Sequence, residues 1–173
     1  MWNKYVMEVQ KDGYIKYISH LDMIKLFKNA FKKGGIKLAY SQGFNPHPKI
    51  GFAQPLSLGY SSSCEILEFE MMEDMEPAQI LDKMCPIMPK GIALINCRRS
   101  TDNNRLAART VAAAYEITIP VKQDFKCQID ELCEAFLKQE NIFALKRQKK
   151  TGSQKEIDIK SMIKSLSGTV ASE

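Results

Sequence analysis

Residues 17–49 read YISHLDMIKLFKNAFKKGGIKLAYSQGFNPHPK. Ser19 is a favourable helix N-cap, and Asp22, three residues later, makes a variant of the capping box, so a helix is predicted to begin here. Apolar side chains follow at helical spacing, at Leu21, Ile24, Phe27 and Phe31. Gly34 and Gly35 end the helix, because glycine accepts the left-handed conformation that a helix C-terminus requires. The stretch therefore predicts an amphipathic helix, then a short strand and a polar loop with two prolines.

Strand signals flank this helix on both sides. Runs of alternating polar and apolar residues, bounded by turn residues, predict strands in the first half of the chain. The expected elements are, in order, strands at 4–9 and 14–18, a helix at 19–33, strands at 36–40, 49–53 and 64–70, a helix at 77–85 and a strand at 92–96. Strand, helix, strand, strand, helix, strand is the order of a ferredoxin-like unit. We expect residues 1–97 to form one such α+β unit.

The second half repeats the beginning of this order. Residues 98–112 are polar and predict a connection between two units. Beyond it, the pattern predicts a strand at 113–119, a helix at 125–138, strands at 142–147 and 157–163, and a hairpin turn at 149–153. The chain ends before a second unit is complete. The predicted fold is therefore α+β, with tandem ferredoxin-like units, the second (residues 113–173) incomplete at its C-terminus.

Composition indicates a soluble, cytoplasmic protein that has no membrane partner and no cofactor of its own. The 173 residues are 45% hydrophobic, which allows a buried core, yet no apolar run approaches the roughly 18–20 residues of a membrane span. The N-terminus has no apolar signal-peptide core. The cysteines form no CxxC pair, so we expect reduced, mostly buried thiols and neither a zinc nor an iron–sulfur site. They are Cys64, Cys85, Cys97, Cys127 and Cys133.

Charge is distributed unevenly along the chain. Residues 1–60 carry nine lysines and three acids, residues 61–90 two lysines and seven acids, and residues 91–173 fourteen basic and ten acidic groups. Two basic blocks thus flank an acidic one, within a net charge of +5. This asymmetry fits an anionic partner such as RNA, although a solvated lysine surface gives the same composition.

Two motifs carry a family resemblance. They are residues 17–22, YISHLD, and residues 39–49, AYSQGFNPHPK, supported by shorter strings at 55–59, 114–116 and 157–159. With them the chain resembles the bacterial radical-SAM-linked family, a domain of unknown function that is free-standing or fused to a cobalamin-binding radical SAM enzyme. The resemblance covers most of the chain. It implies a radical SAM enzyme as partner, and RNA as a substrate class by analogy. The order of the predicted elements and the start of the helix at Ser19 also resemble, distantly, RNA-processing proteins of the repeat-associated CRISPR type.

The radical SAM chemistry would belong to the partner, because the CxxxCxxC cluster motif is missing from this sequence. The two histidines, His20 and His47, both fall inside the motifs and are the candidate catalytic residues, as a general acid–base pair near neutral pH. Alternatively, His20 hydrogen-bonds a neighbouring loop and His47 lies in a rigid loop between prolines. We expect residues 41–49 to form an ordered loop at the mouth of a cleft near the start of the helix.

The candidate residues for binding a nucleic acid or a partner lie in three places. They are Lys25, Lys28 and Lys32 on the helix; Gln42, Phe44, Asn45, His47 and Lys49 in the loop; and Arg98 and Arg99 in the connection. Lysine and arginine suit phosphates, amides suit base edges, and phenylalanine can stack on a base. Each candidate also has a purely structural alternative. The lysines can form a solvated face, the amides can hydrogen-bond the loop backbone, the phenylalanine can be a buried anchor of the loop, and the arginines can be charges of a linker.

Three functions follow from these observations. The first is a non-catalytic accessory protein that binds RNA or presents a substrate to a radical SAM enzyme. The second is a protein-docking domain without nucleic-acid contact. The third is a metal-independent RNA-processing enzyme that uses His20 and His47.

Overall fold

The computed structural model describes residues 2–102, 106–121, 128–148 and 152–170. The chain divides into two compact units, Met1–Tyr115 and Glu116–Glu173. Among the described residues, no helix is both long and apolar enough to cross a bilayer.

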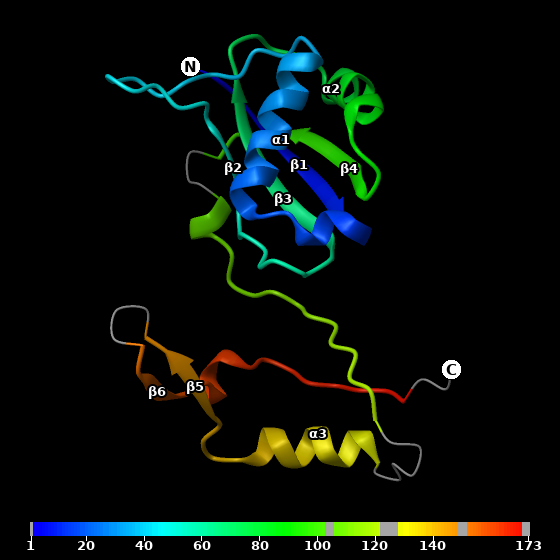
Figure 1. Ribbon diagram of the computed structural model, residues 1–173, viewed down its shortest axis with the longest axis vertical. Coiled ribbons are helices and arrows are strands. Elements are labelled where there is room, and N and C mark those ends of the chain that lie inside the picture. Colours follow the sequence, from blue (N-terminus) through cyan, green and yellow to red (C-terminus); the bar gives the residue numbers. More distant parts are fainter. Residues whose placement is uncertain (1, 103–105, 122–127, 149–151, 171–173) are drawn as a thin grey trace. The chain divides into compact units, whose positions relative to one another are not determined.

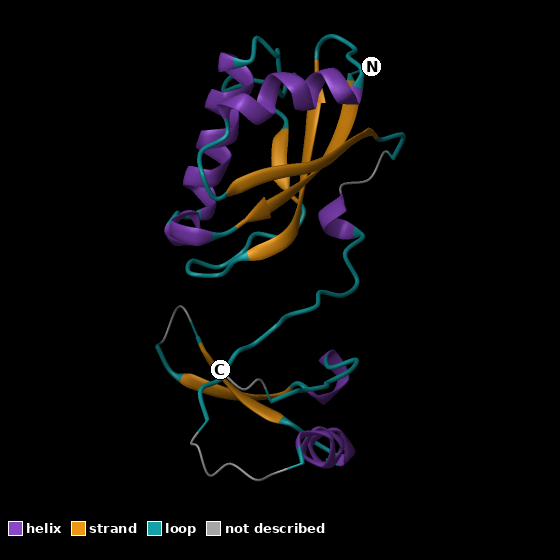
Figure 2. Ribbon diagram, turned by 90° about the vertical axis from the view of Figure 1, so that its right-hand side faces the viewer, coloured by secondary structure: helices purple, strands orange, loops and turns teal. Residues whose placement is uncertain are grey.

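A four-stranded antiparallel sheet with two helices forms the first unit. Its strands are β1 (Asn3–Lys11), β2 (Ile50–Phe52), β3 (Ser62–Met71) and β4 (Ile92–Arg99), and its helices are α1 (His20–Lys33) and α2 (Pro77–Met84). The strand order is β2-β3-β1-β4, and every neighbouring pair is antiparallel. Both helices lie on the same face of the sheet (Figures 1 and 2). The predicted α+β class is therefore present in this unit, whose strands and helices follow the order strand, helix, strand, strand, helix, strand.

The core lies between the sheet and α1. Alternate residues of β1 and β3 point toward the helix, because successive side chains of a strand face opposite sides. The hydrophobic core side chains from these strands and from α1 are Tyr5, Met7, Val9, Leu67, Phe69, Met71, Met23, Phe27, Ala30 and Phe31. Phe31 packs on Phe69 with ring centroids 4.7 Å apart. The apolar stripe of α1 thus holds the helix against the centre of the sheet.

The ends of α1 follow the predicted signals. Ser19 is the N-cap, and its Oγ accepts a hydrogen bond from the Asp22 backbone N–H at 3.2 Å. At the other end, the Ile36 N–H donates to the Phe31 carbonyl at 2.9 Å, across Gly35, whose φ is +68°. This positive φ suits glycine and turns the chain back toward the sheet.

Two predicted strands of the first unit take other forms. Residues 14–18 were expected to be extended, but Gly13–Tyr17 is a 3₁₀ helix. β1 is a central strand between β3 and β4, so both of its edges are already paired. The chain that follows Lys11 cannot pair beside β1 and crosses to α1 instead. Residues 36–40 form only isolated bridges, Leu38 with Met71 and Tyr40 with Pro48, because β3 ends at Met71 and its edge from Phe69 to Leu67 is paired with β2.

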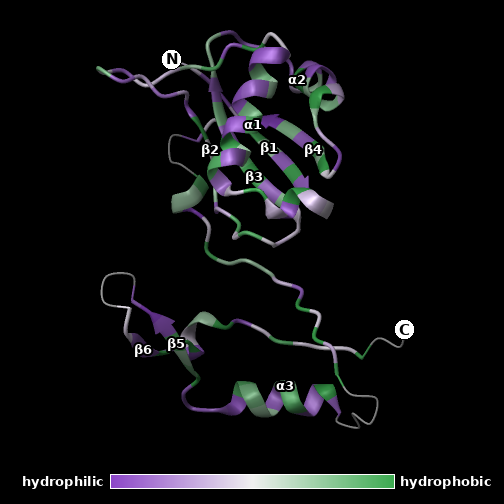
Figure 3. Cartoon of the chain, viewed as in Figure 1, coloured by the Kyte–Doolittle hydropathy of each residue, from purple (hydrophilic) through white to green (hydrophobic). Residues whose placement is uncertain are grey.

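The second unit contains α3 (Ile129–Lys138) and a hairpin of β5 (Phe143–Arg147) and β6 (Gln154–Asp158). Hydrophobic and hydrophilic patches alternate along α3 (Figure 3). The expected strand at 113–119 is wrong, since this segment has no regular secondary structure. The expected extension to residue 163 is also wrong, because β6 ends at Asp158 and Lys160–Met162 is a 3₁₀ helix. The predicted helix start at 125 and most of the turn at 149–153 lie outside the described residues.

The cysteines are less buried than expected. Cys97 is buried and Cys133 is half-buried, whereas Cys64 and Cys85 are exposed, and all four are free thiols. Cys127 lies outside the described residues. Cys97 packs on the core face of β4, and this burial raises its pKa to about 11.

Candidate nucleic-acid interface

The loop of residues 41–47 is closed at its base by two hydrogen bonds. The Ser41 N–H donates to the His47 carbonyl at 2.8 Å, and the His47 N–H donates to Ser41 Oγ at 2.9 Å. Pro48 pairs with Tyr40 immediately outside this closure. The loop projects away from the sheet (the cyan arm in Figure 1). Phe44 lies within it and is fully exposed, so the alternative of a buried phenylalanine anchor is wrong.

Lys49 fixes the loop to the sheet. Its N–H donates to the Ala39 carbonyl at 2.8 Å, and its carbonyl accepts from the Glu70 N–H at 2.9 Å. Its ammonium also forms an ion pair with Glu70 at 2.6 Å. The charge of Lys49 is therefore already balanced by a neighbouring carboxylate.

A groove of about 640 Å³ lies between the second half of α1 and the base of the loop. Its floor is apolar, because the buried side chains of Phe31, Ile36 and Leu38 line it. Its rim carries larger exposed or half-buried side chains, namely Lys28, Lys32, Lys37, Tyr40, Pro48 and Met72. The loop base thus borders a groove beside the second half of α1, whereas the expected cleft lay near the start of the helix.

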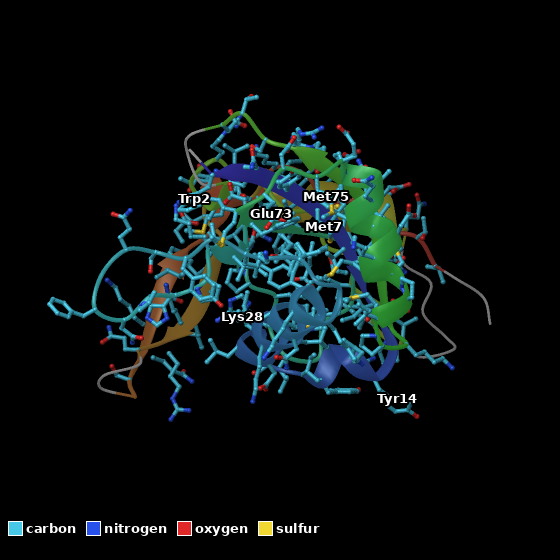
Figure 4. All side chains as sticks on the ribbon, turned by 90° about the horizontal axis from the view of Figure 1, so that it is seen from above. Trp2, Met7, Tyr14, Lys28, Glu73 and Met75 are labelled. Atoms are coloured by element: carbon cyan, nitrogen blue, oxygen red, sulfur yellow. The ribbon has the colours of Figure 1, made fainter. Side chains whose placement is uncertain are left out.

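Lys28 and Lys32 are the free charges of this groove. They are four residues apart on α1, about 6 Å along the helix axis, and share one helix face. Neither forms an ion pair with any described residue, whereas Lys37 on the same rim pairs with Glu73 at 2.9 Å. Figure 4 shows Lys28 on the side of α1 nearer the loop. The groove therefore combines two uncompensated cations with an apolar floor.

A second cavity, of about 350 Å³, adjoins the other residues of the loop base. It is lined by Ser41, His47 and Lys49 together with Lys4, Glu68 and Glu70. Its charges are paired, since Lys4 contacts Glu68 at 2.6 Å and Lys49 contacts Glu70 at the same distance. This cavity is close to electrically neutral, so it attracts an anion less strongly than the groove does.

The two histidines lie in different surroundings. His20 is half-buried, and its ring meets the edge of Phe52 with centroids 5.9 Å apart. His47 is exposed and lines the second cavity, which His20 does not. Neither cavity is lined by both histidines, so neither supplies an acid–base pair.

Arg99 is held by carboxylates. It ends β4, and its guanidinium contacts Asp74 and Glu76 at 2.9 Å each. Its hydrogen bonds and charge lower the pKa of both carboxyl groups, while Glu76 and Asp74 raise the pKa of Arg99. Arg98 precedes it in β4 and is exposed. Both residues were expected in a polar connection; they lie instead in a strand, and neither lines the groove.

The remaining candidates are exposed but lie outside the groove. They are Lys25 on α1 and Gln42 and Asn45 in the loop. Conversely, sequence reasoning missed Lys37, Tyr40 and Met72 on the rim. Of these, Tyr40 could have been identified from the sequence, because it lies inside the motif of residues 39–49, next to the loop. Among the described residues, no cluster of three or more His, Cys, Asp or Glu side chains is placed to hold a metal ion.

The fold and the groove define an α+β protein whose first unit carries a groove with a cationic rim and an apolar floor. Residues 4–173 match the family described as "Uncharacterized protein conserved in bacteria (DUF2344)", and the chain belongs to this family. No curated protein and no solved structure matches the chain.

Proposed function

We propose that this protein is a non-catalytic RNA-binding module that works beside a radical SAM enzyme. The observation that carries the proposal is the groove, in which Lys28 and Lys32 stand without ion pairs to described residues above an apolar floor. Phosphates need cations that are not already neutralised, and bases need apolar or aromatic surface. The groove offers both within one unit.

The fold is a separate part of the proposal. We propose that the first unit is ferredoxin-like, because strand, helix, strand, strand, helix, strand is its element order and both helices cover one face of the sheet. We propose that α3 followed by the β5–β6 hairpin is the middle of a second unit of this kind. A fold of this type hosts many functions, so the argument for RNA rests on the groove alone.

The association with a radical SAM enzyme rests on the resemblance carried by residues 17–22 and 39–49. A tagged chain expressed in its native host should retain such an enzyme during purification. Non-catalytic action is supported by the separate surroundings of the two histidines, since a proton-transfer pair must reach a common substrate atom.

The test of RNA binding is the salt dependence of affinity. Binding of a mixed RNA pool should weaken linearly on a log–log scale as salt rises, by about 0.7 for each phosphate contact with a single strand. Replacing both groove lysines, Lys28→Ala and Lys32→Ala, should lower this slope by roughly one to two units. The matched control replaces Lys83 and Lys90, which are exposed residues of the same unit outside the groove. The control variant should keep the wild-type slope.

Each alternative function has its own outcome. An equal slope in the wild type and the groove variant would contradict the proposal and favour a protein-docking domain. Cleavage of RNA in the presence of a chelator, abolished by His20→Ala or His47→Ala, would instead identify an RNA-processing enzyme.

A further inference from the structure

We infer that the groove and the adjoining loop take unpaired bases, so that the ligand is a single-stranded segment of RNA and a duplex is excluded. The inference rests on the proposed function and adds the class of RNA and the residue that stacks on it. Phe44 is the proposed stacking platform, and the groove beside Tyr40 is the proposed site for a neighbouring base.

Phe44 is presented to solvent by a loop that is already closed. The hydrogen bonds between Ser41 and His47 fix the base of the loop, and Pro46 and Pro48 restrict its backbone. A side chain held in place before binding loses little conformational entropy when a ligand arrives. The ring of Phe44 is fully exposed to water, and a base stacked on it would remove that apolar surface from water.

The groove supplies a second surface for a base. Phe31, Ile36 and Leu38 form its apolar floor, and on the rim Tyr40 is 51% exposed and Met72 is 52% exposed. Its volume of about 640 Å³ lies within the range of small-molecule sites, roughly 300–1,000 Å³, so it has room for a nucleobase. Exposed apolar side chains beside unpaired lysines match the chemistry of a nucleotide, which joins a flat base to an anionic phosphate.

A duplex would leave these features unused. Its bases are already stacked on one another, and the major groove of A-form RNA is too narrow for side chains to enter. Only the phosphates of a duplex would reach Lys28 and Lys32, whereas Phe44 and the apolar floor would stay exposed to water. Single-stranded RNA satisfies the cations and the apolar surface at the same time.

The experiment compares one RNA in two states. The full chain is titrated at fixed salt with a fluorescently labelled 12-nucleotide RNA, and with the same RNA annealed to its complement. We expect the single strand to bind at least tenfold more tightly. Phe44→Ala should weaken single-strand binding about fivefold or more, the typical loss of one stacked base, and should leave the salt slope unchanged. Tyr14→Ala, which removes an equally exposed aromatic outside the groove, is the matched control and should bind as the wild type does.

A direct readout of stacking comes from Phe44→Trp. Its fluorescence should be quenched by the single strand and not by the duplex, and its affinity should match that of the wild type. Equal binding of both RNAs, with Phe44→Ala unchanged, would overturn the inference; the proposed function would stand if the slope still depended on Lys28 and Lys32. If neither the single strand nor the duplex bound, both the inference and the proposed function would be overturned.

Discussion

Glu65 lies in β3 among residues that form the core. It alternates with Leu67 and Phe69, which are fully buried, and its own exposure is 8%. Burial raises the pKa of its carboxyl group, while the charge of Lys11, itself buried, lowers that pKa by a smaller amount. One oxygen of Glu65 has no hydrogen-bond partner among the described residues. The ionised form is therefore less favourable in the folded protein than in water.

This environment predicts a pH dependence of stability. Because the pKa of Glu65 is raised in the folded state, the free energy of unfolding should fall as pH rises from about 4.5, the ordinary glutamate value, through the folded-state pKa. Glu65→Gln removes the ionisation, so this variant should be more stable than the wild type at pH 7 and should lose that advantage below pH 4.5. Urea unfolding of both proteins across this pH range measures the difference. Glu73→Gln, at an exposed position, is the control. A wild type that gains stability relative to Glu65→Gln on going to pH 7 would contradict the account.

The sequence pattern of β3 predicted a strand but not which side chains face the core. Cys64 and Ile66 suggest one face and Leu67 and Phe69 the other, so the alternation changes phase within the strand. The structure buries the odd-numbered residues, which exposes Cys64 and places Glu65 inside. Pairing with β1 on one side and β2 on the other decides this face, and that pairing joins residues up to 68 positions apart, Asn3 with Met71.

At the scale of elements, α1 is the helix on which the groove depends. Two hydrogen bonds between Ser19 and Asp22 cap its first turn. Ser19 Oγ accepts from the Asp22 backbone N–H and also donates to the Asp22 carboxylate at 2.6 Å. The cap satisfies a backbone donor that would otherwise have no partner within the helix. It also places a carboxylate near the positive end of the helix dipole.

Removing this cap should destabilise the protein without altering the groove. Ser19→Ala should lower the free energy of unfolding by about 1 kcal/mol, the usual loss for a helix N-cap. Ser19→Asp should recover part of the loss, because its carboxylate can accept the same hydrogen bond. Chemical denaturation measures both variants, and RNA affinity under native conditions should stay at the wild-type level. An unchanged stability in Ser19→Ala would mean that the cap contributes nothing to α1.

The elements of the chain differ in how far local sequence determines them. α1 was predicted with its ends because cap, apolar stripe and terminal glycines all lie within the helix itself. Residues 113–119 alternate as a strand should, yet this segment pairs with no strand among the described residues and stays irregular. The lysines of the groove follow from helical spacing alone. Its opposite rim does not, because residues 37–40 reach it through long-range pairing with the end of β3.

At the scale of the whole molecule, folding redistributes the charge blocks of the sequence. Acids of residues 61–90 pair with cations from elsewhere in the first unit. These pairs are Lys4–Glu68, Lys37–Glu73, Lys49–Glu70, Arg99–Asp74 and Arg99–Glu76. The lysines of α1 take part in none of the ion pairs of the described residues. Four cations of this unit without an ion pair to described residues, Lys25, Lys28, Lys32 and Lys33, therefore share α1, and two of them, Lys28 and Lys32, line the groove.

The most direct test of the RNA-binding groove is an NMR titration of the ¹⁵N-labelled chain, whose mass of 19.7 kDa suits the method. Single-stranded RNA is added in steps, and the amide shifts are mapped on the structure. We predict that the largest changes fall on residues 28–32, 37–40 and 44–48, which form both rims of the groove and the loop. Lys28→Ala with Lys32→Ala should reduce these changes at the same RNA concentration. Changes confined to β4 or to the second unit, or no changes at saturating RNA, would contradict the central claim.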